Sequence, residues 1–312
     1  MTARGTRRPF RFIAPMPRLD RPAYVWREDL RRVEDLGFDT VAVSDHITHG
    51  WVMDPLVVMT AAAAATRRLR VLSLVLGNDY RHPAFVHKAA ATLTVLSEGR
   101  LELGIGAGWM VDDYEATGVP FDPAAVRVDR LAESLEVVTA LFGEQPVTFV
   151  GKHYRVVDLD GLPKPRTRPP LLVGGGGRRV LRLAGRTADI AGINPAHGRN
   201  RDAVDDMSPE RVRQKVDWVR DGATHAGRDP DDVELQMSML RVAVNGSTAV
   251  SSMFARHPDD PATMRSPAVL AGTVASCIER LQEIRERYGI SYFHLGGDVK
   301  AVAPIVGALA GT

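Results

Sequence analysis

The segment Leu93–Trp109 reads Leu-Thr-Val-Leu-Ser-Glu-Gly-Arg-Leu-Glu-Leu-Gly-Ile-Gly-Ala-Gly-Trp and carries the clearest fold signal in the chain. Apolar residues at helical spacing indicate that it begins as the end of a helix, which Gly99 can cap in a left-handed conformation. A short apolar strand is predicted next, over Leu101–Ile105. In parallel α/β proteins, the loop after such a strand is where ligands bind.

Glycine recurs at every second position where this strand ends, as Gly104, Gly106 and Gly108. Glycine at that spacing lets a backbone pass close to another group without a β-carbon in the way. A tight turn between strand and helix is the alternative explanation. The spacing is not that of the dinucleotide motif Gly-x-Gly-x-x-Gly, because the third glycine comes too early and no helix is predicted directly after it.

The composition is that of an ordinary globular protein, with 312 residues of which 45% are hydrophobic and 25% are charged. A formal net charge of +2 gives no reason to expect a nucleic-acid partner. The single cysteine, Cys277, cannot form an internal disulfide. No apolar run approaches the roughly 18 residues of a membrane span, and the first residues lack the apolar core of a signal peptide. We therefore expect a cytoplasmic protein without a membrane partner.

Short apolar strands alternate with amphipathic helices along the whole chain. The predicted strands cover residues 10–15, 40–44, 71–76, 101–105, 171–173, 189–193, 233–244 and 291–295. The predicted helices cover residues 24–36, 55–65, 83–96, 127–142, 180–184, 212–223, 273–288 and 299–309. Eight strand–helix units predict an α/β protein with a closed (β/α)₈ architecture, a TIM barrel. A doubly wound open sheet is the structural alternative.

The barrel is expected to form a single domain over residues 1–312, with three insertions. Residues 144–168 contain a predicted hairpin. The segments 194–209 and 245–272 exceed normal loop length, and both leave the C-terminal end of a predicted strand. Long loops in compact domains are usually functional lids or disordered segments. Their position favours lids, so we expect insertion loops at the C-terminal face.

Two polar segments directly follow predicted strands. Asp45 and His46 come after the second strand, where histidine can exchange protons near neutral pH and an adjacent carboxylate can orient it. A histidine at a helix entry capped by Asp45 is the alternative. The loop with Asn78 and Arg81 follows the third strand and ends at a proline that suits a helix start. A capping loop with solvated charges is the alternative there.

Four successive glycines, Gly174–Gly177, precede Arg178 between a buried strand and a helix. Several N–H groups at a helix N-terminus form an anion site by geometry and dipole, so phosphate binding is predicted, with a flexible connector as the alternative. No metal site is predicted, because His46 and His49 lack nearby cysteine or a partnered carboxylate pattern. The sequence therefore suggests a phosphorylated cofactor at the mouth of a barrel.

Several motifs together resemble the bacterial luciferase-like flavin superfamily, and most closely its deazaflavin-dependent branch, which uses coenzyme F420. The motifs are Tyr80–Pro83, Leu96–Trp109, Val173–Gly177 and Ala184–Asp189. The resemblance extends over nearly the whole chain, from Ser44 to Gly297. It is highly specific for the superfamily and less so for one cofactor, so flavin mononucleotide (FMN) is the alternative.

The resemblance implies that the cofactor binds at the C-terminal mouth of the barrel. Asp45 and His46 would be catalytic residues beside its ring, and a cis peptide bond is expected near Leu74-Val75. The cofactor-binding residues would be Leu74, Val75, Asn78, Arg81, Gly106, Ala107, Gly108, Trp109, Gly174, Gly175, Gly176, Gly177 and Arg178. Sugar-phosphate dehydrogenases of this branch have an acidic glutamate where Gly108-Trp109 stands here, so their substrate is not carried over.

The leading hypothesis is an F420-dependent oxidoreductase that transfers a hydride between the cofactor and a small organic substrate. One alternative is a luciferase-type monooxygenase that uses reduced FMN and dioxygen. Another is a non-catalytic cofactor-binding barrel. The Asp45-His46 pair argues against the last, since a binding relic needs no proton donor. The expected partner is a small molecule, with no nucleic acid and no membrane, and a homodimer is left open.

Overall fold

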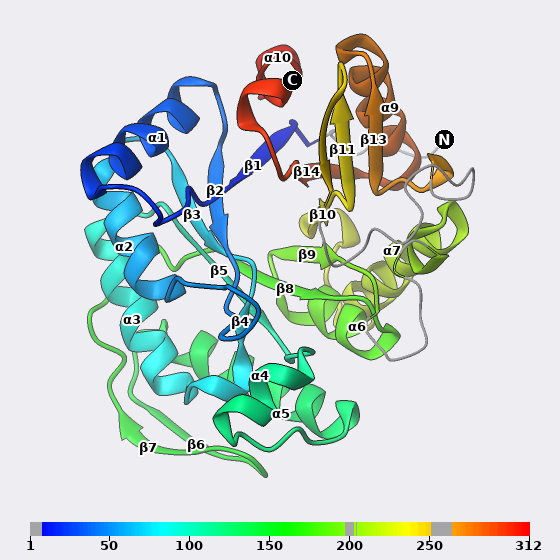
Figure 1. Ribbon diagram of the computed structural model, residues 1–312. Helices are drawn as coiled ribbons and strands as arrows, with labels where there is room; N and C mark the ends of the chain where they lie inside the picture. Colours follow the sequence, from blue (N-terminus) through cyan, green and yellow to red (C-terminus); the bar gives the residue numbers. More distant parts are fainter. Residues whose placement is uncertain (1–7, 197–202, 204, 251–263) are drawn as a thin grey trace.

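The structure, a computed structural model, describes residues 8–196, 203, 205–250 and 264–312. Its barrel strands are β1 (Arg11–Pro15), β2 (Thr40–Val43), β3 (Arg70–Ser73), β4 (Leu76–Gly77), β5 (Leu101–Gly106), β8 (Leu171–Gly175), β9 (Ile190–Ile193), β10 (Glu234–Ser238) and β14 (Ile290–His294). They pair in the order β3-β2-β1-β14-β10-β9-β8-β5-β4, and β3 also pairs with β5, which closes the ring (Figure 1). The predicted (β/α)₈ barrel is confirmed, and the open-sheet alternative is wrong.

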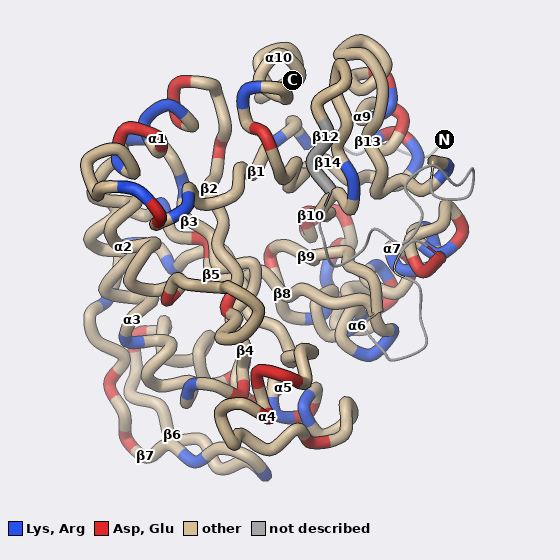
Figure 2. Tube along the Cα trace, in the orientation of Figure 1, with Lys and Arg blue, Asp and Glu red and all other residues tan. Residues whose placement is uncertain are grey.

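Helices surround this barrel (Figure 1). They are α1 (Ala23–Asp35), α2 (Pro55–Ala65), α3 (Pro83–Leu96), α4 (Val111–Thr117), α5 (Ala124–Leu141), α6 (Arg178–Thr187), α7 (Pro209–His225), α9 (Val274–Tyr288) and α10 (Val299–Leu309), with the 3₁₀ turns η1 (Asn78–Tyr80), η2 (Asp205–Met207) and η3 (Pro230–Asp232). Acidic and basic residues are interleaved along α1, α7 and α9 (Figure 2). Within the described ranges, no helix is both long and apolar enough to cross a membrane.

Two apolar layers lie on either side of the barrel wall. The inner layer consists of Ile13, Ala42, Leu72, Leu172, Ile190 and Tyr292. The outer layer lies between strands and helices, and α1 contributes Trp26, Leu30 and Val33 to it. The strands are therefore buried on both faces, which explains why the sequence shows apolar runs rather than strict alternation.

The third barrel strand is interrupted. The predicted strand over residues 71–76 is two short strands, β3 and β4, with Leu74 and Val75 between them. The peptide bond between these two residues is cis, as expected. Both halves pair with β5, so the interruption does not open the ring.

Glycines on two neighbouring strands make room for Val75. A β-carbon at Gly106 would lie 2.6 Å from Cγ2 of Val75. Those at Gly104 and Gly174 would lie 3.2 Å from its Cγ1. The three glycines therefore let the backbones of β5 and β8 pass close to a side chain that projects from the interrupted strand.

The prediction of one strand over residues 233–244 is wrong, because this segment contains two strands. β10 belongs to the barrel, whereas β11 (Arg241–Val244) pairs with β12 (Ser247–Val250) and β13 (Val269–Gly272) in a separate three-stranded sheet. The chain leaves the barrel at Leu240, whose N–H donates to the carbonyl of Ala268 at 2.8 Å. The sequence did not reveal where the chain passes from β10 to β11, because both strands bury apolar residues.

The predicted hairpin in residues 144–168 is present as the antiparallel pair β6 (Val147–Val150) and β7 (Arg155–Leu159). Of the two predicted lids, 194–209 includes η2 and 245–272 includes β12 and β13. The parts of these lids at 197–202, 204 and 251–263 lie outside the described residues. A short helix, α4, begins soon after the glycine segment, although no helix is predicted there.

A charged network joins the N-terminal ends of the strands. Glu102 is fully buried and accepts hydrogen bonds from Arg11, from Arg70 at 2.7 Å and from the hydroxyl of Tyr292 at 2.6 Å. Arg11 also pairs with Glu234 at 2.8 Å. Burial by itself raises the pKa of Glu102, but the two guanidinium groups and the hydroxyl hold it below its usual value. Five strands that are distant in sequence thus share one carboxylate network.

We expect Glu102→Gln to lower the free energy of unfolding by about 3–5 kcal/mol, because Arg70 loses its buried counter-charge and Arg11 keeps only Glu234. The folded-state pKa of Glu102 is depressed, so its contribution is complete above the unfolded-state pKa and is lost as pH falls through the folded-state pKa. The difference between the two proteins should therefore shrink from pH 7 to pH 3. Urea unfolding measures it, with the exposed Glu115→Gln as control, and equal midpoints for both variants at pH 7 would contradict the prediction.

Candidate active site at the barrel mouth

The carboxyl ends of the strands form the mouth of the barrel, where enzymes of this fold carry their chemistry. The loop after β2 carries His46, the loop after β5 carries Trp109, and α4 carries Asp113. Helix α4 lies next to the turn after β4, where the rings of Tyr80 and Tyr114 are 5.4 Å apart (Figure 1). Segments from three neighbouring strands thus meet on one side of the mouth.

A buried carboxylate orients His46. Nδ1 of His46 lies 2.7 Å from Oδ2 of Asp113, whose side chain is fully buried, while that of His46 is 12% exposed. Within the described part of the chain, the imidazole makes no other hydrogen bond. Because one ring nitrogen is fixed by Asp113, the other is available to a ligand at the mouth.

Asp113 also fastens the loop that follows His46. Its Oδ1 accepts hydrogen bonds from the N–H of Ile47 at 3.2 Å and from both the N–H and the hydroxyl of Thr48, at 2.9 and 2.6 Å. The hydroxyl of Tyr80 lies 3.4 Å from Oδ2. Burial alone raises the pKa of Asp113, but the donors from Thr48, His46 and Ile47 lower it to about 2. The carboxylate is therefore charged at any physiological pH.

Two tryptophans flank the histidine. The ring centroid of His46 lies 5.2 Å from that of Trp51 and 5.4 Å from that of Trp109, which meets it edge-on. Trp51 is 37% exposed. The indoles limit the positions of the imidazole and offer apolar area to a flat ligand.

The expected role of Asp45 as the partner of His46 is wrong. Asp45 is buried and accepts hydrogen bonds from both terminal nitrogens of Arg81 and from the N–H of Gly77 at 3.0 Å. Asp45 therefore anchors Arg81 and β4, and Asp113 holds the histidine.

The polar loop after β4 is locally satisfied. Asn78 donates to the hydroxyl of Tyr154, which comes from the hairpin insertion, at 3.1 Å. His82 caps α3 by accepting from the N–H of Ala84 at 3.2 Å, as the capping alternative predicted. Arg81 bridges Asp45 and Asp54. The structure thus brings Asn78 and Arg81 to the mouth, and their cofactor contacts stay a prediction.

The glycine segment after β5 is explained by packing. Gly108 has a φ of 74°, and a β-carbon there would collide with the hydroxyl of Tyr114. Its carbonyl accepts from Arg127 at 2.6 Å. Ala107 packs against the main core. The segment lies at the mouth, but its contact with a cofactor tail stays a prediction.

The second glycine segment leads into α6. A β-carbon at Gly175 would lie too close to Val180, and one at Gly176 would collide with backbone atoms of the loop after β9. At Gly177 nothing lies within 4 Å of the β-carbon position. Gly177 is the N-cap of α6, and no side chain caps this helix. Among the described residues, the first N–H groups of α6 therefore receive no side-chain cap, and Arg178 beside them is exposed.

A buried lysine ties the loops after β8 and β9 together. Nζ of Lys215 contacts the carbonyl oxygens of Gly176 at 2.7 Å and Asn194 at 3.0 Å, and Oδ2 of Asp206 at 2.7 Å. The same carboxylate oxygen accepts from the N–H of Ala196 at 2.6 Å. The glycine loop is therefore ordered, and the flexible-connector alternative is wrong.

Asp113 was missed by the sequence reasoning. A signal for it existed, since Asp112 and Asp113 stand together soon after Trp109, and acidic residues favour the first turn of a helix. That pattern locates a helix start, but only the fold shows that the second carboxylate meets His46.

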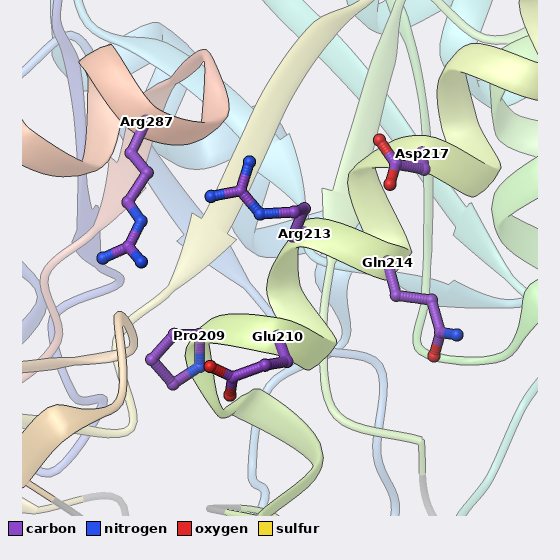
Figure 3. Close-up of a pocket in the computed structure, with 6 residues that line it drawn as sticks. All are labelled: Pro209, Glu210, Arg213, Gln214, Asp217 and Arg287. Carbon is purple, nitrogen blue, oxygen red and sulfur yellow. The ribbon is translucent and has the colours of Figure 1, made fainter.

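A pocket of about 260 Å³ lies on the outside of the barrel (Figure 3). Its lining side chains come from α7 and α9 and are Pro209, Glu210, Arg213, Gln214, Asp217 and Arg287. No predicted site residue belongs to it. In the described ranges, no group of three or more His, Cys, Asp or Glu residues could hold a metal ion. The mouth therefore remains the candidate site.

The curated proteins that are similar to this chain include two of different kinds. An F420-dependent glucose-6-phosphate dehydrogenase of Microbacterium testaceum is 31% identical over 214 residues, which cover 66% of this chain and 60% of that protein. A 4-hydroxyprotoasukamycin monooxygenase of Streptomyces nodosus is 29% identical, over 89% of this chain and 82% of that protein. The alignment with the dehydrogenase thus spans less than two thirds of its length.

Solved structures share the fold. An F420-dependent secondary alcohol dehydrogenase in complex with an F420-acetone adduct has a TM-score of 0.78 at 21% identity, over 96% of this chain and 97% of that one. The family described as luciferase-like monooxygenase matches residues 20–292. This match covers most of the chain and includes both glycine segments and the His46–Asp113 pair. The chain belongs to the luciferase-like monooxygenase family.

Proposed function

We propose that this protein is an F420-dependent oxidoreductase that transfers a hydride between the cofactor and a small organic substrate. The observation that carries the proposal is the pair formed by His46 and the buried Asp113 at the barrel mouth. The F420-dependent dehydrogenases among its relatives and structural neighbours support the cofactor. Because the alignment with the curated dehydrogenase is partial, neither its substrate nor its activity is transferred.

The residues at the mouth fit a phosphorylated deazaflavin. The uncapped N-terminus of α6, with open space at Gly177, suits a phosphate group. The partly exposed side chains of Leu74 and Val75 offer an apolar surface to a ring. When bound, the cofactor would supply a carbon that accepts or donates a hydride.

The chain's own residues would handle the proton that accompanies the hydride. In the oxidative direction, the substrate loses a hydride from carbon and a proton from its hydroxyl, and Nε2 of His46 would take up that proton. Asp113 would stabilise the imidazolium that results, as a buried carboxylate does beside a histidine base. Trp51 and Trp109 would help to exclude water from the reacting groups.

A luciferase-type monooxygenase that uses reduced FMN is the second candidate. The Streptomyces monooxygenase favours it, because that relative aligns with most of this chain. Both cofactors carry a ribityl phosphate, so the site at Gly177 would hold either. Recording the visible absorbance of the protein after soaking with each cofactor distinguishes the two.

We expect Gly177→Asp to weaken F420 binding at least about tenfold, near 1.4 kcal/mol, because it places a negative charge beside the phosphate. The same substitution supplies an N-cap to α6, so the melting temperature should not fall. Gly177→Asn is the matched control, since it caps the helix without charge. Fluorescence titration measures the affinity, and equal affinities for the two variants would contradict the phosphate site. Gly176→Val is not a clean test, because its side chain would collide with the backbone.

We expect His46→Ala to lose about 10²–10⁴-fold in turnover while it keeps cofactor affinity, because the proton acceptor is removed. Asp113→Asn should also lose turnover, since the imidazolium loses its counter-charge. Asp45→Asn should affect mainly stability, through Arg81. Steady-state kinetics and cofactor titration separate these effects. Normal turnover of His46→Ala would show that the histidine only packs.

We also propose that the barrel and its three insertions form one domain and that the protein is a homodimer. Exposed apolar side chains on α2 and α3 support the dimer. Val57 is 70% exposed and Phe85 is 73% exposed, and Ala61 and Ala64 continue the exposed face of α2. Such a face can pair with its copy about a two-fold axis. A cytoplasmic location stays a prediction from the sequence.

If α2 and α3 form the dimer interface, Phe85→Asp should shift the protein from dimer to monomer, because a charge would be buried without a partner. Size-exclusion chromatography with light scattering measures the mass. Lys300→Asp, on the exposed surface of α10 and outside α2 and α3, controls for charge alone. A wild-type protein with the mass of a single chain would refute the dimer.

A further inference from the structure

The wall of the mouth formed by β9, β10 and β14 has no role in the function proposed so far. Side chains two residues apart on a strand point to the same face. Tyr292 points into the barrel, where its hydroxyl meets Glu102 at 2.6 Å, so His294 faces inward one level higher. On β10, Gln236 is fully buried beside Gly192 and Ser238 follows it.

The same rule places the side chain of Asn194, which follows Gly192 at the end of β9. A β-carbon at Gly192 would lie 3.4 Å from Nδ2 of Asn194 and 3.1 Å from Oε1 of Gln236. Residues 238 and 294 are register partners on neighbouring strands. Asn194, Ser238 and His294 are therefore the last inward positions of three adjacent strands, at the end of the barrel where ligands bind.

Polar atoms on this wall lack partners. Oε1 of Gln236 is buried and makes no hydrogen bond with any described residue. Its Nε2 donates to Oγ of Ser238 at 3.3 Å, which leaves the hydroxyl hydrogen of Ser238 for another acceptor. Among the described residues, neither the imidazole of His294 nor the side-chain amide of Asn194 makes a hydrogen bond. Both side chains are partly exposed. Buried polar groups normally have partners, so unused ones at a mouth indicate a polar ligand.

This wall is also uncharged. Burial lowers the pKa of His294 to about 4, so its imidazole is neutral at pH 7 and can both donate and accept. Asn194 and Ser238 carry no charge. An anion such as a sugar phosphate gains little from neutral groups, whereas a hydroxyl or carbonyl oxygen matches them. On the other side of the mouth, His46 would take up the proton and Asp113 would stabilise the resulting imidazolium.

We propose that Asn194, Ser238 and His294 form a neutral substrate subsite, which binds the reacting oxygen of an uncharged secondary alcohol or its ketone. The proposal rests on the proposed F420-dependent activity and specifies its substrate class. His294 and Ser238 donate to the substrate oxygen, and Gln236 positions Ser238 from below. The subsite selects against phosphorylated substrates.

The test uses the full chain loaded with oxidised F420. The probes are 2-butanol, cyclohexanol and menthol as uncharged secondary alcohols, cyclohexanone as a non-reacting ketone, and glucose 6-phosphate as the anion. Loading itself tests the proposed function, because a protein that binds no F420 lacks that activity. With loading established, cyclohexanone should change the fluorescence of the bound cofactor, and glucose 6-phosphate should not.

The variant His294→Leu should keep its F420 affinity within about twofold and raise the KM for the reactive alcohol, and the Kd for cyclohexanone, at least about tenfold. His294→Gln should recover most of both, since its amide also donates and accepts. The exposed His225→Leu on α7 is the matched control. The subsite is refuted if loaded wild-type protein prefers glucose 6-phosphate, if it responds to none of the alcohols, or if His294→Leu leaves both constants unchanged.

Discussion

The side chain of Val75 lies against three positions on neighbouring strands that lack a β-carbon. Gly104 and Gly106 on β5 and Gly174 on β8 surround it, and a β-carbon at Gly106 would lie 2.6 Å from it. The hydroxyl of Ser73 fixes the register by bonding both the N–H and the carbonyl of Gly104 at 2.9 Å. The third strand can therefore be interrupted without opening the ring.

A buried carboxylate lies at each end of the barrel, Glu102 at the N-terminal ends of the strands and Asp113 at the mouth. The two differ in the groups that balance their charge. Glu102 meets permanent cations, Arg11 and Arg70, and so its charge is balanced inside the fold. Asp113 is held by backbone N–H groups, hydroxyls and one imidazole. Its charge can be balanced when His46 takes up a proton. A guanidinium group stays charged and cannot exchange a proton in this way. The first arrangement stabilises the barrel, and the second suits proton transfer.

Family membership and substrate choice are separate questions in this fold, because the function is carried by side chains at the strand ends. The solved F420-dependent alcohol dehydrogenase shares the barrel with this chain at 21% identity. Sugar-phosphate dehydrogenases of the branch that this chain resembles have a glutamate where Gly108-Trp109 stands here. In this chain the indole of Trp109 packs edge-on against His46. An apolar edge there and a neutral wall at His294 both favour an uncharged substrate.

The sequence by itself determined the barrel, because the alternation of buried strands and amphipathic helices is a local pattern. Helices α2, α3 and α10 begin and end at the predicted residues. Proline marks the first residue of α2 and α3, and apolar residues at helical spacing run the length of α10. The glycine segments and the cis bond between Leu74 and Val75 were located from motifs. The glycines at 104, 106 and 174 are explained by their shared contact with Val75, which exists only once three strands lie together in the fold.

Only the tertiary structure decided which residues act together at the mouth. Asp45 is next to His46 in sequence, yet its carboxylate accepts hydrogen bonds from Arg81. Asp113 is 67 positions away, yet it meets His46 at 2.7 Å. The exit of β11 from the barrel was equally hidden, since both sheets bury the same kinds of residue. Local pattern fixes elements, whereas the pairing of side chains from different strands depends on how the ring closes.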